Sequence, residues 1–231
     1  MRVVGHWLKR ALLLVLGLFL IWQLWLLGWV LLWGWVNPGE TRFMEIRLAE
    51  LRQKVPNAQL KQQWVPYERI SIHLKRAIIA AEDAKFVDHE GFDWEGMQKA
   101  LENNQKRGRF VAGGSTISQQ LAKNLFLTPT KSYFRKAEEA IITLMLENLW
   151  SKRRIFEVYL NVIEWGNGVF GAEAAARHYF NVGAAQLGPE QAARLAGMVP
   201  NPRFYDRNRG APGLGRKTGI ILGRMAGADV P

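Results

Sequence analysis

The longest apolar stretch of the chain lies near its start. Residues Ala11 to Val36, ALLLVLGLFLIWQLWLLGWVLLWGWV, carry no charge and one strongly polar side chain, Gln23. A helix of roughly 20 apolar residues spans a bilayer core, and tryptophans gather in the second half, where an aromatic belt would lie. The pattern therefore predicts a transmembrane anchor over 11–36. The alternative, a cleaved signal peptide, has a shorter apolar region that ends in small residues.

Charges before this stretch predict its orientation. Arg2, Lys9 and Arg10 precede it, and no acidic residue does. Because basic residues favour the cytoplasmic side, we expect residues 1–10 in the cytoplasm and residues 37–231 outside, in the periplasm or the extracellular space.

After the anchor, apolar positions recur with a helical rather than a strand period. No convincing run of alternating residues predicts a strand, and there is no internal repeat. The exported part is therefore expected to be a single, mainly α-helical domain. Helices are predicted over 41–54, 70–84, 94–104, 133–150, 152–163, 170–180, 189–199 and 215–225.

Composition narrows the class of partner. The chain has no cysteine, which excludes disulfides and thiolate metal sites. Its net charge of +11 suits an anionic partner such as a phospholipid, a lipid-linked phosphate or a nucleic acid. We expect no nucleic-acid partner, because the domain lies outside the membrane.

The segment GGSTISQQLAKN, residues 113–124, combines glycines, hydroxyls and carboxamides. Thr116 and Gln119 have capping-box spacing, so a helix is expected to begin at Ile117. Glycines before a helix N-terminus leave N–H groups that attract anions. A well-capped surface helix without a ligand is the alternative, and the lysine is too far from the glycines for a P-loop.

Glu82 ends a helix whose neighbouring positions are apolar, with Phe86 one turn further on. A carboxyl in such surroundings is a candidate general acid or base, because desolvation changes its proton affinity. The alternative is a solvated carboxylate at a helix end. The acidic residues and His89 that follow match no specific metal-ligand spacing.

Cations cluster between residues 123 and 154. Arg135 and Lys136 are expected in the first turns of a helix, where the helix dipole disfavours positive charge. An external anion such as a diphosphate would offset this, and so would pairing with Glu138 and Glu139. The sequence leaves both possibilities open.

Taken together, these segments resemble the peptidoglycan glycosyltransferases of family 51, most closely the monofunctional enzymes of Gram-negative bacteria. The likeness runs over residues 70–202, and its motifs occur in one order behind an anchor. They are EDAKFVDHEG (82–91), GGSTISQQLAKN (113–124), RKAEEAIITLMLE (135–147), KRRIFEVYLN (152–161), GNGVFGAEAAARHYF (166–180) and LAGMVPNP (195–202).

The resemblance implies a lysozyme-like helical fold with a lobe near the membrane. It implies polymerisation of lipid II, a disaccharide-peptide carried on undecaprenyl diphosphate, into β-1,4-linked glycan with inversion at the anomeric carbon. The growing strand is the donor, and the 4-hydroxyl of the incoming lipid II is the acceptor. The location implied is the bacterial inner membrane. Since the sequence ends at Pro231, we expect no transpeptidase domain.

The resemblance also assigns roles to residues. Glu82 matches the general base, and Glu139 matches a second carboxylate on the donor side. Lys136 matches an essential cation, and Lys131 stands where the family usually has an arginine toward the diphosphate. The expected substrate-binding residues are Ser115, Gln120, Lys123, Lys131, Arg135 and Lys136.

No cofactor is expected to be tightly bound, and no protein metal cage is predicted. A divalent cation, Mg or Mn, is expected to assist departure of the diphosphate. Expected partners are lipid II, the growing lipid-linked strand, the membrane, and cell-division or wall-synthesis proteins. Two alternatives in function are a glycan-cleaving muramidase or lytic enzyme, which a carboxylate pair would permit, and a non-catalytic anchored scaffold.

Overall fold

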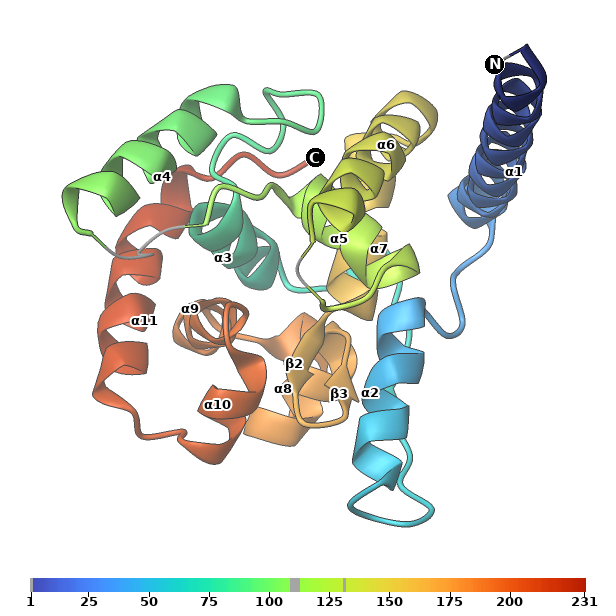
Figure 1. Ribbon diagram of the computed structural model, residues 1–231. Coiled ribbons are helices and arrows are strands. Elements are labelled where there is room, and N and C mark those ends of the chain that lie inside the picture. Colours follow the sequence, from blue (N-terminus) through green and yellow to red (C-terminus); the bar gives the residue numbers. More distant parts are fainter. Residues whose placement is uncertain (1, 109–112, 131) are drawn as a thin grey trace. The chain divides into compact units, whose positions relative to one another are not determined.

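The computed structural model describes residues 2–108, 113–130 and 132–231 (Figure 1). The chain divides into two compact units, Met1–Pro38 and Gly39–Pro231.

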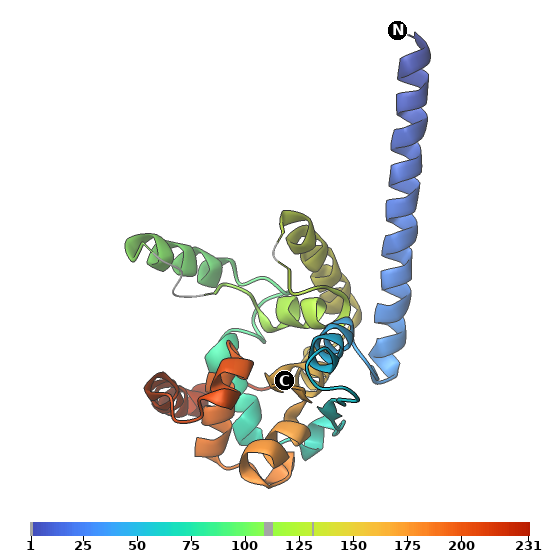
Figure 2. The same cartoon turned by 60° about the horizontal axis from the view of Figure 1, so that its bottom comes forward.

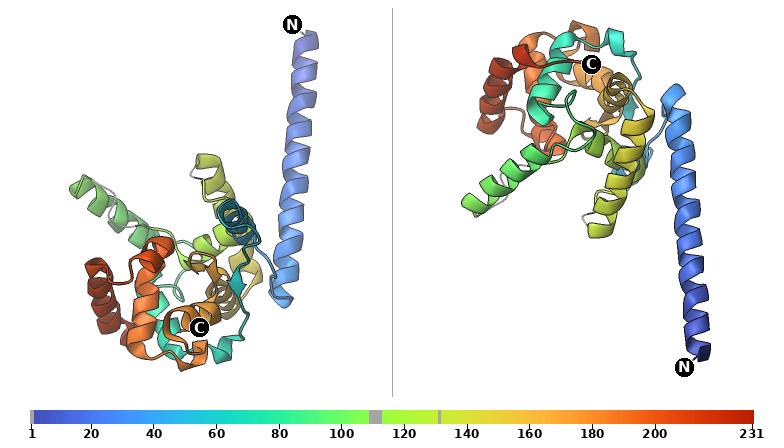
Figure 3. Two further views of the ribbon diagram at one scale, coloured as in Figure 1. Left: turned by 90° about the horizontal axis from the view of Figure 1, so that it is seen from below. Right: turned by 90° about the horizontal axis from the view of Figure 1, so that it is seen from above.

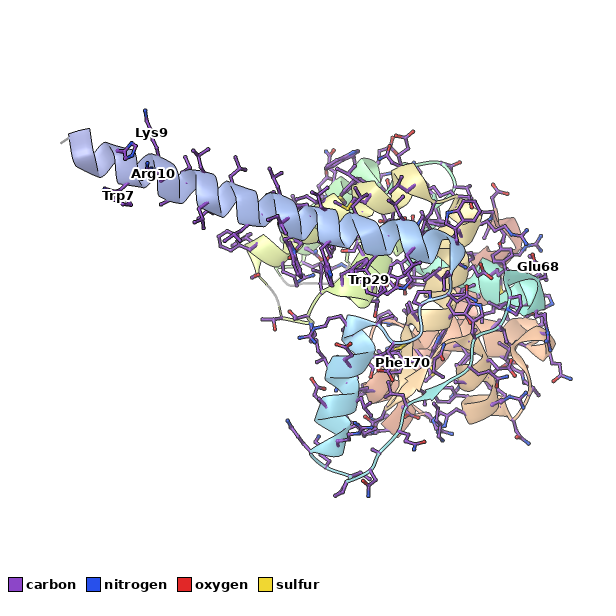
Figure 4. All side chains as sticks on the ribbon, turned by 90° about the vertical axis from the view of Figure 1, so that its right-hand side faces the viewer. Trp7, Lys9, Arg10, Trp29, Glu68 and Phe170 are labelled. Carbon is purple, nitrogen blue, oxygen red and sulfur yellow. The ribbon has the colours of Figure 1, made fainter. Side chains whose placement is uncertain are left out.

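The first unit is dominated by one long helix, α1 (Arg2–Trp35). Its part from Lys9 to Trp35 is long and apolar enough to cross a membrane. The side chains of Lys9 and Arg10 lie toward one end of this helix, and Trp29 lies in the other half (Figure 4). Trp22 and Trp25 stack with their ring centroids 4.9 Å apart.

The second unit is mainly helical and confirms the predicted fold class. Side-chain caps begin many of its helices, because a hydroxyl or carboxylate satisfies the free N–H groups of the first turn. The α-helices are α2 (Arg42–Arg52), α3 (Ile72–Glu82), α4 (Trp94–Lys106), α5 (Ile117–Phe126), α6 (Tyr133–Leu149), α7 (Lys152–Val162), α8 (Ala172–Phe180), α9 (Pro189–Met198), α10 (Pro202–Arg207) and α11 (Pro212–Arg224). Single 3₁₀ turns are η1 (Tyr67–Arg69), η2 (Ala184–Gln186) and η3 (Met225–Gly227).

Helix α5 begins where the capping box predicts. The Thr116 hydroxyl accepts a hydrogen bond from the Gln119 amide, and the Gln119 side chain accepts one from the Thr116 amide. Its apolar side chains Ile117, Leu121 and Leu125 are buried. Because these positions are four residues apart, they form the core face of the helix.

A small sheet contradicts the prediction that the domain has no strands. Strand β2 (Glu164–Gly166) pairs antiparallel with β3 (Val169–Phe170), and β1 (Lys61–Gln62) pairs parallel with β3. Strands of two or three residues are too short to show alternation. Asn167 and Gly168 join β2 to β3, and an Asn-Gly pair is typical of a two-residue hairpin loop; Gly168 has a φ of +73°.

Two helix boundaries near the C-terminus also differ from prediction. No helix was predicted between residues 199 and 215, but Pro202 starts α10 soon after the end of α9. Helix α11 starts at Pro212 rather than Gly215. Both starts have the same cause, since proline lacks an N–H that the first turn would leave free.

Within the second unit, α4 and α6 project from the remaining helices, and α5 lies between their bases (Figures 2 and 3). Helix α5 packs against both α6 and α7, and α3 packs against α9. Hydrogen bonds bring the end of α3 together with the starts of α5 and α6, which places the predicted site residues near one another.

Candidate active site

Two consecutive carboxylates, Glu82 and Asp83, lie at the end of α3 and accept hydrogen bonds from different partners. Asp83, in an extended conformation, accepts a hydrogen bond of 3.0 Å from the Ile117 amide at the first turn of α5. His89 Nε2 donates to the same carboxylate at 2.9 Å, and the Gly91 amide donates to His89 Nδ1 at 3.1 Å. These contacts select the His89 tautomer that carries its proton on Nε2.

This arrangement changes the interpretation of the α5 N-terminus. The sequence predicted that its N–H groups attract an anion, and the anion found there is the Asp83 carboxylate. Thr116 ties the same turn to the preceding loop through a 2.7 Å hydrogen bond to the Gly91 carbonyl. Asp83 is buried, so it acts as a structural support for α5.

Glu82 points to the side of α5 instead. Its Oε2 accepts a 2.8 Å hydrogen bond from Gln120 Nε2, and the Tyr159 hydroxyl donates to Gln120 Oε1 at 3.0 Å. Tyr159 thereby fixes which end of the amide faces Glu82. Burial raises the pKa of Glu82, whereas the Gln120 hydrogen bond and the charges of Lys217 and Lys123 partly oppose that rise.

The second predicted carboxylate, Glu139, is buried between two cations. Arg135 Nη1 lies 2.5 Å from Glu139 Oε2, and Lys136 Nζ donates to Glu139 Oε1. Lys136 also donates to the Ser115 hydroxyl at 3.3 Å. Of the two possibilities left open above, pairing of Arg135 and Lys136 with Glu139 is therefore present.

Lys123 connects the two carboxylates electrostatically. Burial lowers the pKa of Lys123, and the negative charges of Glu139 and Glu82 counteract that effect. The lysine therefore lies close enough to both carboxylates to interact with each of them.

Two hollows border this cluster. One of about 180 Å³ lies between α3, α4 and the start of α5, and its walls include Glu82, Met97 and Ser115. The other, of about 390 Å³, is lined in part by Gln120 and Lys123. The pair Glu82–Gln120 therefore has one member on each hollow.

The structure brings the predicted site residues together with one exception. Lys131 lies outside the described residues. The gathered residues are Glu82, Ser115, Gln120, Lys123, Arg135, Lys136 and Glu139. In the part of the chain that the structure describes, no three histidine or acidic side chains gather closely enough to hold a metal ion.

Two further residues at this site were not predicted from the sequence. Tyr159 orients Gln120 from the buried face of α7, and Lys217 approaches Glu82 from α11. The motif that contains Tyr159 was recognised, but its spacing gives no sign of a contact with α5. Lys217 lies outside every motif considered, so only the packing of α11 reveals it.

A helical domain that holds a desolvated carboxylate beside a cluster of cations fits the class of enzymes that transfer a group from an anionic leaving group. The transglycosylase family model matches residues 49–226. The chain therefore belongs to this family and is a glycosyltransferase of peptidoglycan synthesis.

Full-length relatives agree with the family assignment. The chain is 88% identical over 231 residues, covering 100% of both chains, to the biosynthetic peptidoglycan transglycosylase of Dechloromonas aromatica (strain RCB). It is 62% identical over 231 residues, again covering 100% of both, to the protein of that name in Azoarcus sp. (strain BH72). It is 64% identical over 222 residues, 96% of each chain, to its counterpart in Aromatoleum aromaticum. A non-catalytic scaffold is not supported by these relatives.

Proposed function

We propose that the chain polymerises lipid II into β-1,4-linked glycan, with Glu82 as the general base. One observation carries the proposal: a carboxylate whose pKa is raised by burial lies beside a cluster of cations. A base with a raised pKa accepts a proton more readily near neutral pH. Cations nearby stabilise the charge that develops on a departing diphosphate.

The chemical step then follows from these positions. The Glu82 carboxylate takes the proton of the acceptor 4-hydroxyl as that oxygen attacks C1 of the donor sugar. The new C1–O4 bond forms on the face opposite the breaking bond to the diphosphate oxygen, so the anomeric carbon inverts. The electron pair of the broken bond leaves with undecaprenyl diphosphate, whose charge Lys123 and Lys136 offset.

Glu139 has a positioning role in this scheme. It is buried and engages both Arg135 and Lys136, so it holds two cations that a helix N-terminus would otherwise disfavour. Lys136 also donates a hydrogen bond to the Ser115 hydroxyl. An arriving diphosphate competes with Glu139 for these cations.

We also propose that a divalent cation assists the diphosphate. The described residues do not fit a resident metal site, because the buried Glu139 is already paired with two cations. Such an ion would reach the site on the diphosphate oxygens and supply positive charge there. A chelator should slow polymerisation and leave the melting temperature of the ligand-free protein unchanged; a fall in melting temperature would indicate a resident metal instead.

For the membrane, we propose an inner-membrane anchor with residues 1–10 in the cytoplasm and 37–231 in the periplasm. The apolar helix α1 and the cations at its start support this orientation. The chain has no cysteine, so Glu90→Cys provides a unique label site on the domain. A membrane-impermeant maleimide should label it from the periplasm of intact cells, and labelling only after lysis would reverse the orientation.

Wall-synthesis or cell-division proteins remain proposed partners.

Purified protein with labelled lipid II tests the function. The wild type should form long glycan, and Glu82→Gln should form none while retaining its fold. Polymerisation by Glu82→Gln would contradict the assignment of the base. Release of fragments from purified cell wall, without polymer from lipid II, would favour the glycan-cleaving alternative.

A further inference from the structure

A third hollow, lined by charged side chains, lies apart from the Glu82 carboxylate. It has a volume of about 430 Å³ and is enclosed by α2, the β2–β3 hairpin and α10, which lie near one another in the lower part of Figure 1. Gly168 packs so tightly against α2 that an added Cβ would lie 3.1 Å from Leu51. The hairpin and α2 therefore pack together and form one wall of the hollow.

Cations outnumber carboxylates in this hollow. Its charged lining residues are Arg47, Glu50, Lys54, Glu164, Arg203 and Arg207. Arg47 pairs with Glu50 at 2.7 Å and with Glu164 at 3.2 Å, and Arg203 pairs with Glu50 at 3.1 Å. Two cations are therefore used to neutralise the two carboxylates of the lining.

Lys54 and Arg207 carry the positive charge of the lining that no carboxylate neutralises. Both are exposed, and neither forms an ion pair or side-chain hydrogen bond with another residue that the structure describes. The buried Glu164 Oε1 likewise accepts no hydrogen bond among the described residues, and Arg203 Nε is 3.8 Å from it. The hollow thus offers two unpaired cations and one unused acceptor to a ligand.

The hollow lies next to one of the two hollows at the candidate active site. It shares Arg47, Glu164, Asn201 and Arg203 with the hollow that Gln120 and Lys123 line. The next units of a donor strand whose diphosphate lies at Lys123 would therefore be close to this third hollow.

We propose that this hollow binds a carboxylate of the peptide carried by the glycan strand. The inference rests on the function proposed above, in which the substrate is a disaccharide-peptide. The sugar backbone carries no formal charge and would not require unpaired cations, whereas a peptide ends in a carboxylate. Lys54 and Arg207 bind that carboxylate, and Glu164 Oε1 accepts a hydrogen bond from a peptide amide.

Two lipid II substrates test the proposal, one with a free peptide carboxylate and one with the same peptide ending in a primary amide. Wild-type kcat/KM should be about threefold higher for the free acid, the size expected of partly exposed charge pairs. This ratio should fall toward one at high salt, which screens exposed charges. It should also fall toward one in the double variant Lys54→Gln/Arg207→Gln.

The matched control removes two other exposed cations, with Arg216→Gln/Arg224→Gln on α11, and should keep the wild-type ratio. Equal use of both substrates by the wild type would overturn this inference alone. A ratio that persists in Lys54→Gln/Arg207→Gln would overturn it as well, because the carboxylate is then recognised elsewhere. No polymer from either substrate would overturn the proposed function and this inference with it.

Discussion

Gln120 Nε2 lies 2.8 Å from Glu82 Oε2 and donates a hydrogen bond to it. The bond favours the charged form of a carboxylate whose pKa burial raises. Because Tyr159 donates to the opposite end of the amide, the orientation of Gln120 is determined by a residue of another helix.

This relationship predicts how the pH profile responds to Gln120→Ala. Removing the hydrogen bond should raise the pKa of Glu82 further, so the acidic limb of kcat/KM should move to higher pH. Tyr159→Phe should move the limb in the same direction by less, because the amide remains but is no longer fixed. A limb unchanged in Gln120→Ala would show that Glu82 is not the group that titrates in that limb.

The ionised form of Glu82 should support activity but lower the stability of the folded protein. Because the folded-state pKa of Glu82 is raised above 4.5, its contribution to stability is lost as pH rises from that value through the raised pKa. Glu82→Gln should therefore melt at the same temperature as the wild type or higher at neutral pH, while polymerisation is lost. Thermal melts at pH 4 and pH 8 test this, and a variant less stable at pH 8 would contradict it.

Lys217 should act on Glu82 through its charge. Its positive charge lowers the pKa of Glu82, and its Nζ lies 5.3 Å from the centre of the Tyr205 ring. Lys217→Met should shift the acidic limb to higher pH, whereas Lys217→Arg, which keeps the charge, should leave the limb at its wild-type position. Arg216→Met, which removes the neighbouring exposed cation, should leave the limb unchanged. A loss of activity at every pH with no shift would point to a structural role for Lys217.

Asp83 should behave differently from its neighbour. Asp83→Ala removes the acceptor of the Ile117 amide and the partner of His89, so it should destabilise the domain by about 1–3 kcal/mol. Denaturant melts of Asp83→Ala and Glu82→Gln, compared side by side, test this division of labour. Equal stability of the two variants would show that the hydrogen bonds of Asp83 contribute little.

These residues also show what the sequence could predict. Thr116 and Gln119 lie three positions apart, so local spacing alone identified the start of α5. Asp83 and Ile117 are separated by 34 positions, and their contact depends on how α3 packs relative to α5. The motifs indicated which residues belong to the site, whereas the partners of each residue, including Lys217, depend on tertiary packing that a spacing rule does not contain.

Lys123 provides the last test, because burial lowers its pKa although two carboxylates oppose the effect. Lys123→Met keeps the apolar stem and removes a desolvated charge, so the melting temperature should stay equal or rise. Polymerisation should fall by about tenfold or more, because a cation close to the developing diphosphate charge is lost. Lys99→Met, on the exposed face of α4, should leave both properties unchanged. A sharp fall in melting temperature with activity per folded molecule preserved would instead make Lys123 a structural residue of α5.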